Sequence, residues 1–79
     1  MALRRHNIST DLEIDGEPWR VTVTRPFALN ALARRGLSDA EFFDFVKMET
    51  SAITLLARRK IRRGQIVGGK VVLDDLDLG

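Results

Sequence analysis

Residues 37–64, LSDAEFFDFVKMETSAITLLARRKIRRG, carry the strongest local folding signal in the chain. Ser38 and Glu41 have the spacing of a capping box, in which each side chain bonds the backbone N–H of the other residue at a helix start. Leu37 and Phe42 occupy the two positions of a hydrophobic staple, which fixes the direction in which the chain enters the helix. The sequence therefore predicts that a helix begins at this point.

Apolar residues recur beyond this start with the period of an α-helix, and they form one broad stripe. The stripe comprises Phe42, Phe45, Val46, Ala52, Ile53, Leu56, Ala57 and Ile61. A straight helix over residues 39–63 would be about 37 Å long at about 1.5 Å per residue. A domain of this size is only about 30 Å across. Because the stripe also thins at residues 48–51, we expect a bend or break there and an end at Gly64.

The segment TDLEIDGEPWRVTVT, residues 10–24, reads as a β-hairpin, because apolar and polar residues alternate on both sides of an Asp15-Gly16 turn. The segment QIVGGKVVL, residues 65–73, reads as a second hairpin with a Gly68-Gly69 turn. The alternation in the first hairpin predicts one buried and one solvated face of the sheet.

Between the first hairpin and the capping box, RPFALNAL has a helical period. Thr24 is its predicted cap, Pro26 lies in the first turn, and Gly36 is the predicted stop. The residues expected along its buried side are Phe27, Ala28, Ala31 and Leu32.

The element order is thus ββααββ, and the predicted fold class is α+β: a small antiparallel sheet with two or three helices packed on one face. The 79 residues make a single domain, 1–79, with residues 1–9 expected as a flexible N-terminus. So short a chain buries only about 60–65% of its unfolded surface, which leaves little room for a deep cleft and favours self-association.

Several kinds of chemistry find no support in the residues. The chain lacks cysteine, and His6, its only histidine, stands in a polar segment that indicates a solvated side chain. A metal site needs three or four converging ligands, and the acidic runs lack calcium-loop spacing. No apolar run approaches the roughly 20 residues of a membrane helix, and the N-terminus does not resemble a secretory signal. We expect a cytoplasmic protein without cofactor, metal, membrane contact or catalytic residues.

Charge is strongly segregated along the chain, although the net charge is only +2. Residues 11–17 and 39–49 are acidic, residues 58–70 hold six bases and no acid, and the C-terminal DDLDL is acidic again. Blocks of both signs suit internal pairing or contact between copies as well as they suit nucleic acid.

The sharpest functional signal is a cluster of arginines at the end of the long helix, here named the basic strip: Arg58, Arg59, Arg62 and Arg63. The cluster spreads over about 140° of the helix, largely opposite the apolar stripe, at about 100° per residue. Lys60 falls on the apolar side and is expected to reach water along its stem. The simplest interpretation is a solvated helix end whose cations offset the macrodipole.

Binding is the other interpretation of the basic strip, either to an acidic protein surface or to nucleic acid. No aromatic residues are interleaved for base stacking, which weakens a single-strand interpretation. A helix-turn-helix around residues 31–46 is disfavoured, since Asp39, Glu41 and Asp44 would face phosphates.

Four segments in order, VTVTRPFALNAL, FFDFV, AITLLARRKIRRG and GKVVLDDLDL, resemble a family of short bacterial proteins, the domain-of-unknown-function family 1488. The resemblance covers roughly residues 10–78 and implies a small α+β domain with no established activity. Before the isoleucine such proteins carry a polar–basic pair, whereas this chain has Glu49-Thr50. The residues that carry the resemblance are Val21, Val23, Ala28, Leu29, Phe42, Phe45, Ile53, Ala57, Arg58, Gly64, Val71 and Asp77.

These observations favour a non-catalytic protein-interaction module that forms a homodimer, with nucleic-acid binding through the basic strip as the alternative. The dimer expectation rests on four phenylalanines and a tryptophan in a chain too small to bury them all, together with charge blocks of opposite sign.

Overall fold

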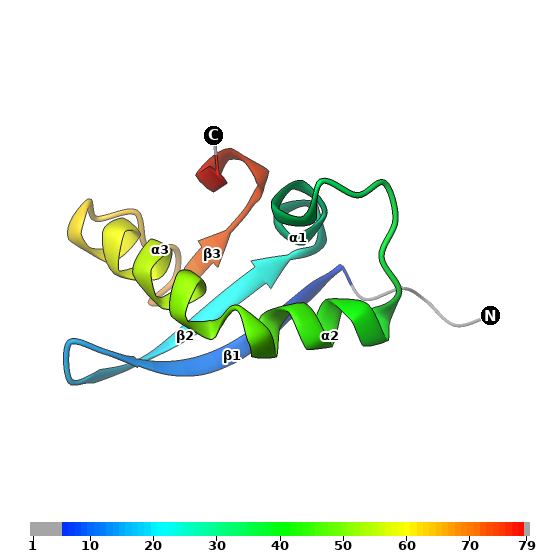
Figure 1. The fold of residues 1–79 in the computed structure, drawn as a ribbon. Coiled ribbons are helices and arrows are strands. Elements are labelled where there is room, and N and C mark those ends of the chain that lie inside the picture. The colour runs from blue at the N-terminus through cyan, green and yellow to red at the C-terminus, as the bar shows by residue number, and fades with distance from the viewer. Residues whose placement is uncertain (1–5, 79) are drawn as a thin grey trace.

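The structure, a computed structural model, describes residues 6–78 of the chain. Two strands are followed by three helices, a short third strand and a 3₁₀ turn (Figure 1). The α+β class predicted from the sequence is confirmed. The elements are β1 (Asn7–Ile14), β2 (Glu17–Thr24), α1 (Arg25–Leu32), α2 (Asp39–Met48), α3 (Thr50–Arg62), β3 (Val71–Leu73) and η1 (Asp75–Leu78).

Strands β1 and β2 form the predicted hairpin. Asp15 and Gly16 both have positive φ, 53° and 82°, as a tight two-residue turn between twisted strands requires. The strands pair antiparallel from Ile14 opposite Glu17 to Asn7 opposite Thr24. Residues 7–9 are therefore part of the sheet and not of the flexible N-terminus expected over residues 1–9; residues 1–5 lie outside the described part.

The sheet is mixed and not wholly antiparallel, which corrects one detail of the prediction. Its strand order is β1-β2-β3, and β3 runs parallel to β2, with Val21 opposite Val71 and Val23 opposite Leu73. A parallel pair needs a crossover connection of a dozen or more residues, and the three helices between β2 and β3 supply one, whereas the predicted hairpin would have left β3 antiparallel to its neighbour.

The predicted second hairpin is reduced to its turn. Gly68 and Gly69 have positive φ and join Val67 to Lys70 in an isolated antiparallel bridge, but residues 65–67 form no strand. Because β3 pairs with β2 instead, the expected ββααββ order becomes ββαααβ followed by η1.

The helices cover one face of the sheet, and the core lies between the two layers (Figure 1). The opposite face is polar: Ser9 and Thr22 hydroxyls lie 2.9 Å apart, and Arg20 bonds Asp11. The buried apolar residues are Ile8, Ile14, Val21, Val23, Phe27, Ala28, Leu37, Phe42, Phe45, Val46, Ile53, Ala57, Val71 and Leu73.

The bend expected at residues 48–51 is confirmed, because α2 ends at Met48 and α3 begins at Thr50. Glu49, between them, has φ −104° and ψ 25°, outside the helical region. The Thr50 hydroxyl donates to the backbone carbonyls of Val46 and Lys47, at 3.2 and 3.0 Å. No helix within residues 6–78 combines the length and the apolar character needed to cross a bilayer.

The capping box at the start of α2 is present as predicted. The Ser38 hydroxyl accepts from the backbone N–H of Glu41, and the Glu41 carboxylate accepts from the backbone N–H of Ser38, each at 3.1 Å. Leu37 and Phe42 are both buried, as a hydrophobic staple requires.

Helix α1 begins as predicted, with Thr24 as its cap and Pro26 in its first turn, but it ends earlier than Gly36. The chain leaves the helix at Ala33, whose φ of 53° is left-handed. The backbone N–H of Arg34 donates to Leu29, and that of Ala33 to Asn30, which is the bonding of a Schellman motif.

An Ala33→Gly variant is expected to be more stable than the natural chain by about 0.5–1 kcal/mol. An L-residue other than glycine costs roughly 1–2 kcal/mol in the left-handed region, and glycine's larger unfolded-state entropy takes back part of that gain. The measurement is urea unfolding. Ala31→Gly, the same change inside α1, is the control, which is expected to lose about 1 kcal/mol. A loss of stability in Ala33→Gly would contradict the left-handed end of α1.

Candidate functional site

The basic strip lies at the C-terminal end of α3, and its last member, Arg63, is the residue that caps the helix. Arg59, Arg62 and Arg63 are exposed, as predicted, whereas Arg58 is half-buried. The four arginines line a shallow hollow of about 420 Å³ together with Leu55, whose side chain is 61% exposed. An apolar side chain thus sits among the cations, which sequence reasoning did not single out.

Two cations of the 58–63 segment are held by acids from other elements. The Arg58 Nε lies 3.3 Å from the Asp15 carboxylate in the β1–β2 turn. Lys60 Nζ donates to the Val72 carbonyl at 2.6 Å and to the Asp77 carboxylate at 3.0 Å. With its side chain only 16% exposed, Lys60 does not reach water as expected. The position of Lys60 on the apolar stripe was the sequence feature that could have indicated this contact between α3 and the C-terminal segment.

A second hollow, of about 460 Å³, lies between the end of α3 and the C-terminal segment. Arg59 and Lys60 of α3 and its capping residue Arg63 contribute to its lining, and Asp74 and Asp77 contribute from the C-terminal side. The Asp77 carboxylate also accepts from the backbone N–H of Asp74, at 2.8 Å. Anionic groups therefore border the basic strip at this edge.

The segregated charge blocks of the sequence meet one another inside the fold. Besides the pairs made by Arg58 and Lys60, Arg34 pairs with Glu41. Arg25, 11% exposed in its side chain, donates to the Leu37 carbonyl and the Asp39 carboxylate. Its guanidinium lies 5.1 Å from the centre of the Phe42 ring. The charge pattern thus stabilises contacts between elements, and Arg25 is a buried cation that the sequence pattern did not reveal.

Glu41 is the group whose titration should be visible in folding stability. Its pKa is lowered from 4.5 to about 2, first by the hydrogen bond from the Ser38 backbone and then by Arg34. A lowered pKa contributes stability that is present above pH 4.5 and is lost as the pH falls towards about 2. We expect the free energy of unfolding of Glu41→Gln, measured with urea, to change less with pH in that window than that of the natural chain.

Asp44→Asn, at an exposed acid of the same helix, is the control for that titration. If the free energy of unfolding depended on pH equally in Glu41→Gln and Asp44→Asn, the capping interaction would not account for the lowered pKa of Glu41.

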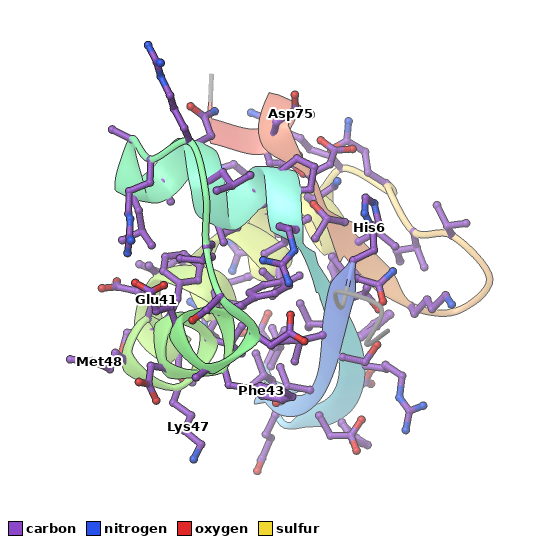
Figure 2. The ribbon with its side chains drawn as sticks, turned by 90° about the vertical axis from the view of Figure 1, so that its right-hand side faces the viewer. His6, Glu41, Phe43, Lys47, Met48 and Asp75 are labelled. Carbon is purple, nitrogen blue, oxygen red and sulfur yellow. The ribbon has the colours of Figure 1, made fainter. Side chains whose placement is uncertain are left out.

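A second candidate surface is an apolar groove between α1 and the bend that joins α2 to α3. Two adjacent hollows, of about 170 and 330 Å³, form it and share Leu32, Phe45 and Glu49 in their linings. The apolar groove is defined here by Ala31, Leu32, Phe45, Met48, Ala52 and Leu56. Figure 2 shows Lys47 and Met48 projecting outward at the end of α2.

Ala31 and Leu32, predicted to line the buried side of α1, are exposed in the apolar groove. The early end of α1 at Ala33 leaves its last turn beyond the edge of the core, so only Arg25, Phe27 and Ala28 of this helix are buried. Met48 is 82% exposed and Leu32 40% exposed. The groove is therefore an apolar surface that the fold itself does not cover.

His6 is exposed at the start of the described chain, and its carbonyl accepts a hydrogen bond from the Arg25 backbone at 2.7 Å. Figure 2 shows it near the end of the sheet, far from Met48 and Lys47. Among residues 6–78, no three histidine or acidic side chains come together in a group that would hold a metal ion.

Comparison of this chain with protein-family models, with curated proteins and with solved structures found no match. The resemblance to the domain-of-unknown-function family 1488 therefore stays an expectation from the sequence, and function is inferred from the two surfaces alone.

Proposed function

We propose that this chain is a non-catalytic, cytoplasmic protein-interaction module that self-associates through the apolar groove. The observation that carries the proposal is the exposure of Leu32 and Met48 on either side of a continuous apolar depression. A contiguous exposed apolar surface of this kind is a common mark of a protein–protein contact.

The phenylalanines, in contrast, contribute less than expected to such a contact. Phe27, Phe42 and Phe45 are buried, and the rings of Phe27 and Phe45 meet edge to face. Phe43 is 39% exposed. The support for self-association therefore moves from the aromatic residues to the aliphatic side chains of the apolar groove.

The rim of the groove suits a second copy of the same chain. The lining of this part of the groove includes one cation, Arg34, which pairs with Glu41, and two further acids, Asp44 and Glu49. A two-fold axis places the same patch of one protomer against that of its partner, so that unlike positions meet. Because the Arg34 side chain is 47% exposed, its guanidinium can bond an acid of the partner while it still pairs with Glu41. A rim of one sign would repel its own copy.

Sedimentation velocity over a concentration series tests the proposal. The natural chain is expected to form dimers at high micromolar concentration, whereas Leu32→Glu and Met48→Glu are expected to remain monomers. A carboxylate placed in an apolar contact is costly unless paired. Both positions are exposed, so their folding is expected to be unchanged, and circular dichroism checks this.

Val67→Glu, at a position 65% exposed in the turn before β3 and outside the groove, is the matched control and is expected to dimerise like the natural chain. A natural chain that stays monomeric throughout the series would dispose of the proposal, and so would equal loss of dimer in the control.

A further inference from the structure

Three arginines of the basic strip remain available after the internal ion pairs are counted. Arg58 is engaged with Asp15, and no carboxylate of the described residues pairs with Arg59, Arg62 or Arg63. These three are spaced i, i+3 and i+4, so they lie on one side of α3 within about 6 Å of helix axis. The fold therefore presents a compact cluster of cations on one helix face.

Acids border this cluster on two sides, which limits what can bind it. Asp15 lies beside Arg58, and Asp74 and Asp77 share a hollow with Arg59 and Arg63. An extended polyanion that crossed the cluster would meet these carboxylates, and screening is weak within the Debye length of about 8 Å at physiological salt. Proteins that bind a duplex strongly through its backbone can make about 6–10 phosphate contacts, more than three arginines supply. These charges disfavour nucleic acid.

Leu55 points to a different class of ligand. Its exposed side chain lines the same hollow as Arg59, Arg62 and Arg63. The phosphate groups of a nucleic acid have no large apolar side chain to place on it. A peptide that carries a large apolar side chain between carboxylates can pack on Leu55 and also accept paired hydrogen bonds from the guanidinium groups.

We propose that α3 binds a short acidic segment of a partner protein, with a large apolar side chain of that segment packed on Leu55 and its carboxylates on Arg59, Arg62 and Arg63. The site lies towards the C-terminal end of α3, apart from the apolar groove, so it adds a second partner to the proposed self-association. The two proposals can be tested separately. Peptide binding tests the site on α3, and sedimentation tests self-association through the apolar groove.

Fluorescence anisotropy with labelled probes tests the site. The first probe is a short peptide of aspartate and glutamate with a central Leu-Phe pair, and the second has Gly-Ser in place of that pair. A single-stranded DNA and a DNA duplex are the third and fourth probes. We expect the Leu-Phe peptide to bind most tightly, and the Gly-Ser peptide to bind roughly tenfold more weakly because it lacks the apolar contact.

Variants of the chain assign the contacts. The double variant Arg59→Ala, Arg62→Ala and the single variant Leu55→Ser are each expected to weaken the Leu-Phe peptide by roughly tenfold. Arg35→Ala and Lys47→Ala remove exposed cations elsewhere and are the controls, with affinity expected to be unchanged.

Three outcomes would overturn the proposal. Tighter binding of duplex or single-stranded DNA than of peptide, with a steep loss on raising salt, would assign the strip to nucleic acid. Equal affinity for the two peptides would remove the role of Leu55. Absence of binding by every probe at low salt would leave the strip as a solvated helix end.

Discussion

Phe42→Ala is expected to cost about 3–5 kcal/mol of unfolding free energy. Phe42 is fully buried between α2 and the sheet and is one half of the hydrophobic staple. Its ring also lies 5.1 Å from the Arg25 guanidinium, so the substitution removes both burial and a cation–π contact. Small domains have only about 5–15 kcal/mol in total, so the expected loss is a large share of the stability of the fold.

The adjacent residue provides the matched control. Phe43→Ala changes the same side chain at the next position of α2, but Phe43 is 39% exposed. It is expected to cost less than half as much in urea unfolding. Equal losses at the two positions would show that α2 is rotated relative to the structure described here.

Arg25→Ala is expected to cost about 2–3 kcal/mol, more than the substitution of any other arginine within residues 6–78. Removing one partner of a fully buried ion pair typically costs about 3–5 kcal/mol. Asp39 is 44% exposed and can regain water, which lowers that figure. The Leu37 carbonyl also loses its donor, and the Phe42 ring loses its cation.

Arg34→Ala removes a guanidinium whose side chain is 47% exposed, and its ion pair with Glu41 is correspondingly weaker. Its expected cost is below about 1 kcal/mol. Arg25→Lys separates charge from geometry, because an ammonium cannot reproduce the planar fork that reaches two acceptors; it is expected to lose most of the stability that Arg25→Ala loses. If urea unfolding showed a larger loss of stability for Arg34→Ala than for Arg25→Ala, the contacts of Arg25 with Leu37 and Asp39 would not hold α1 to the start of α2 as described.

Features encoded over a few neighbouring residues could be predicted from the sequence. The Asp15-Gly16 turn depends on two adjacent residues that tolerate positive φ. The capping box depends on two side chains three positions apart, and both features are present. The bend before Thr50 lies where the apolar stripe thins. The molecule is 38 Å long along its longest axis, so its size alone does not require the bend.

Features that depend on distant contacts could not be predicted in the same way. The sequence of residues 71–73 fits a strand equally well in either direction, and only the docking of the helices makes it parallel to β2. The exposure of Leu32 depends on where α1 ends. The helix ends at Ala33, which adopts a left-handed conformation that alanine normally disfavours.

The candidate surfaces show the same division. The exposure of Arg59, Arg62 and Arg63 could be predicted because the helical period separates them from the apolar stripe. The partners of Arg58 and Lys60 could not, since Asp15 and Asp77 come from opposite ends of the chain. Those two acids determine which class of ligand the basic strip favours. That class could therefore be inferred only from the folded structure.

The most direct test of self-association through the apolar groove is a dilution series of the ¹⁵N-labelled chain followed by NMR. Amide shifts that change with concentration are expected at Leu32, Phe45, Met48 and Ala52, while those of β1 and of the basic strip stay constant. Spectra that do not change with concentration, or changes confined to the exposed edge of β1, would contradict it.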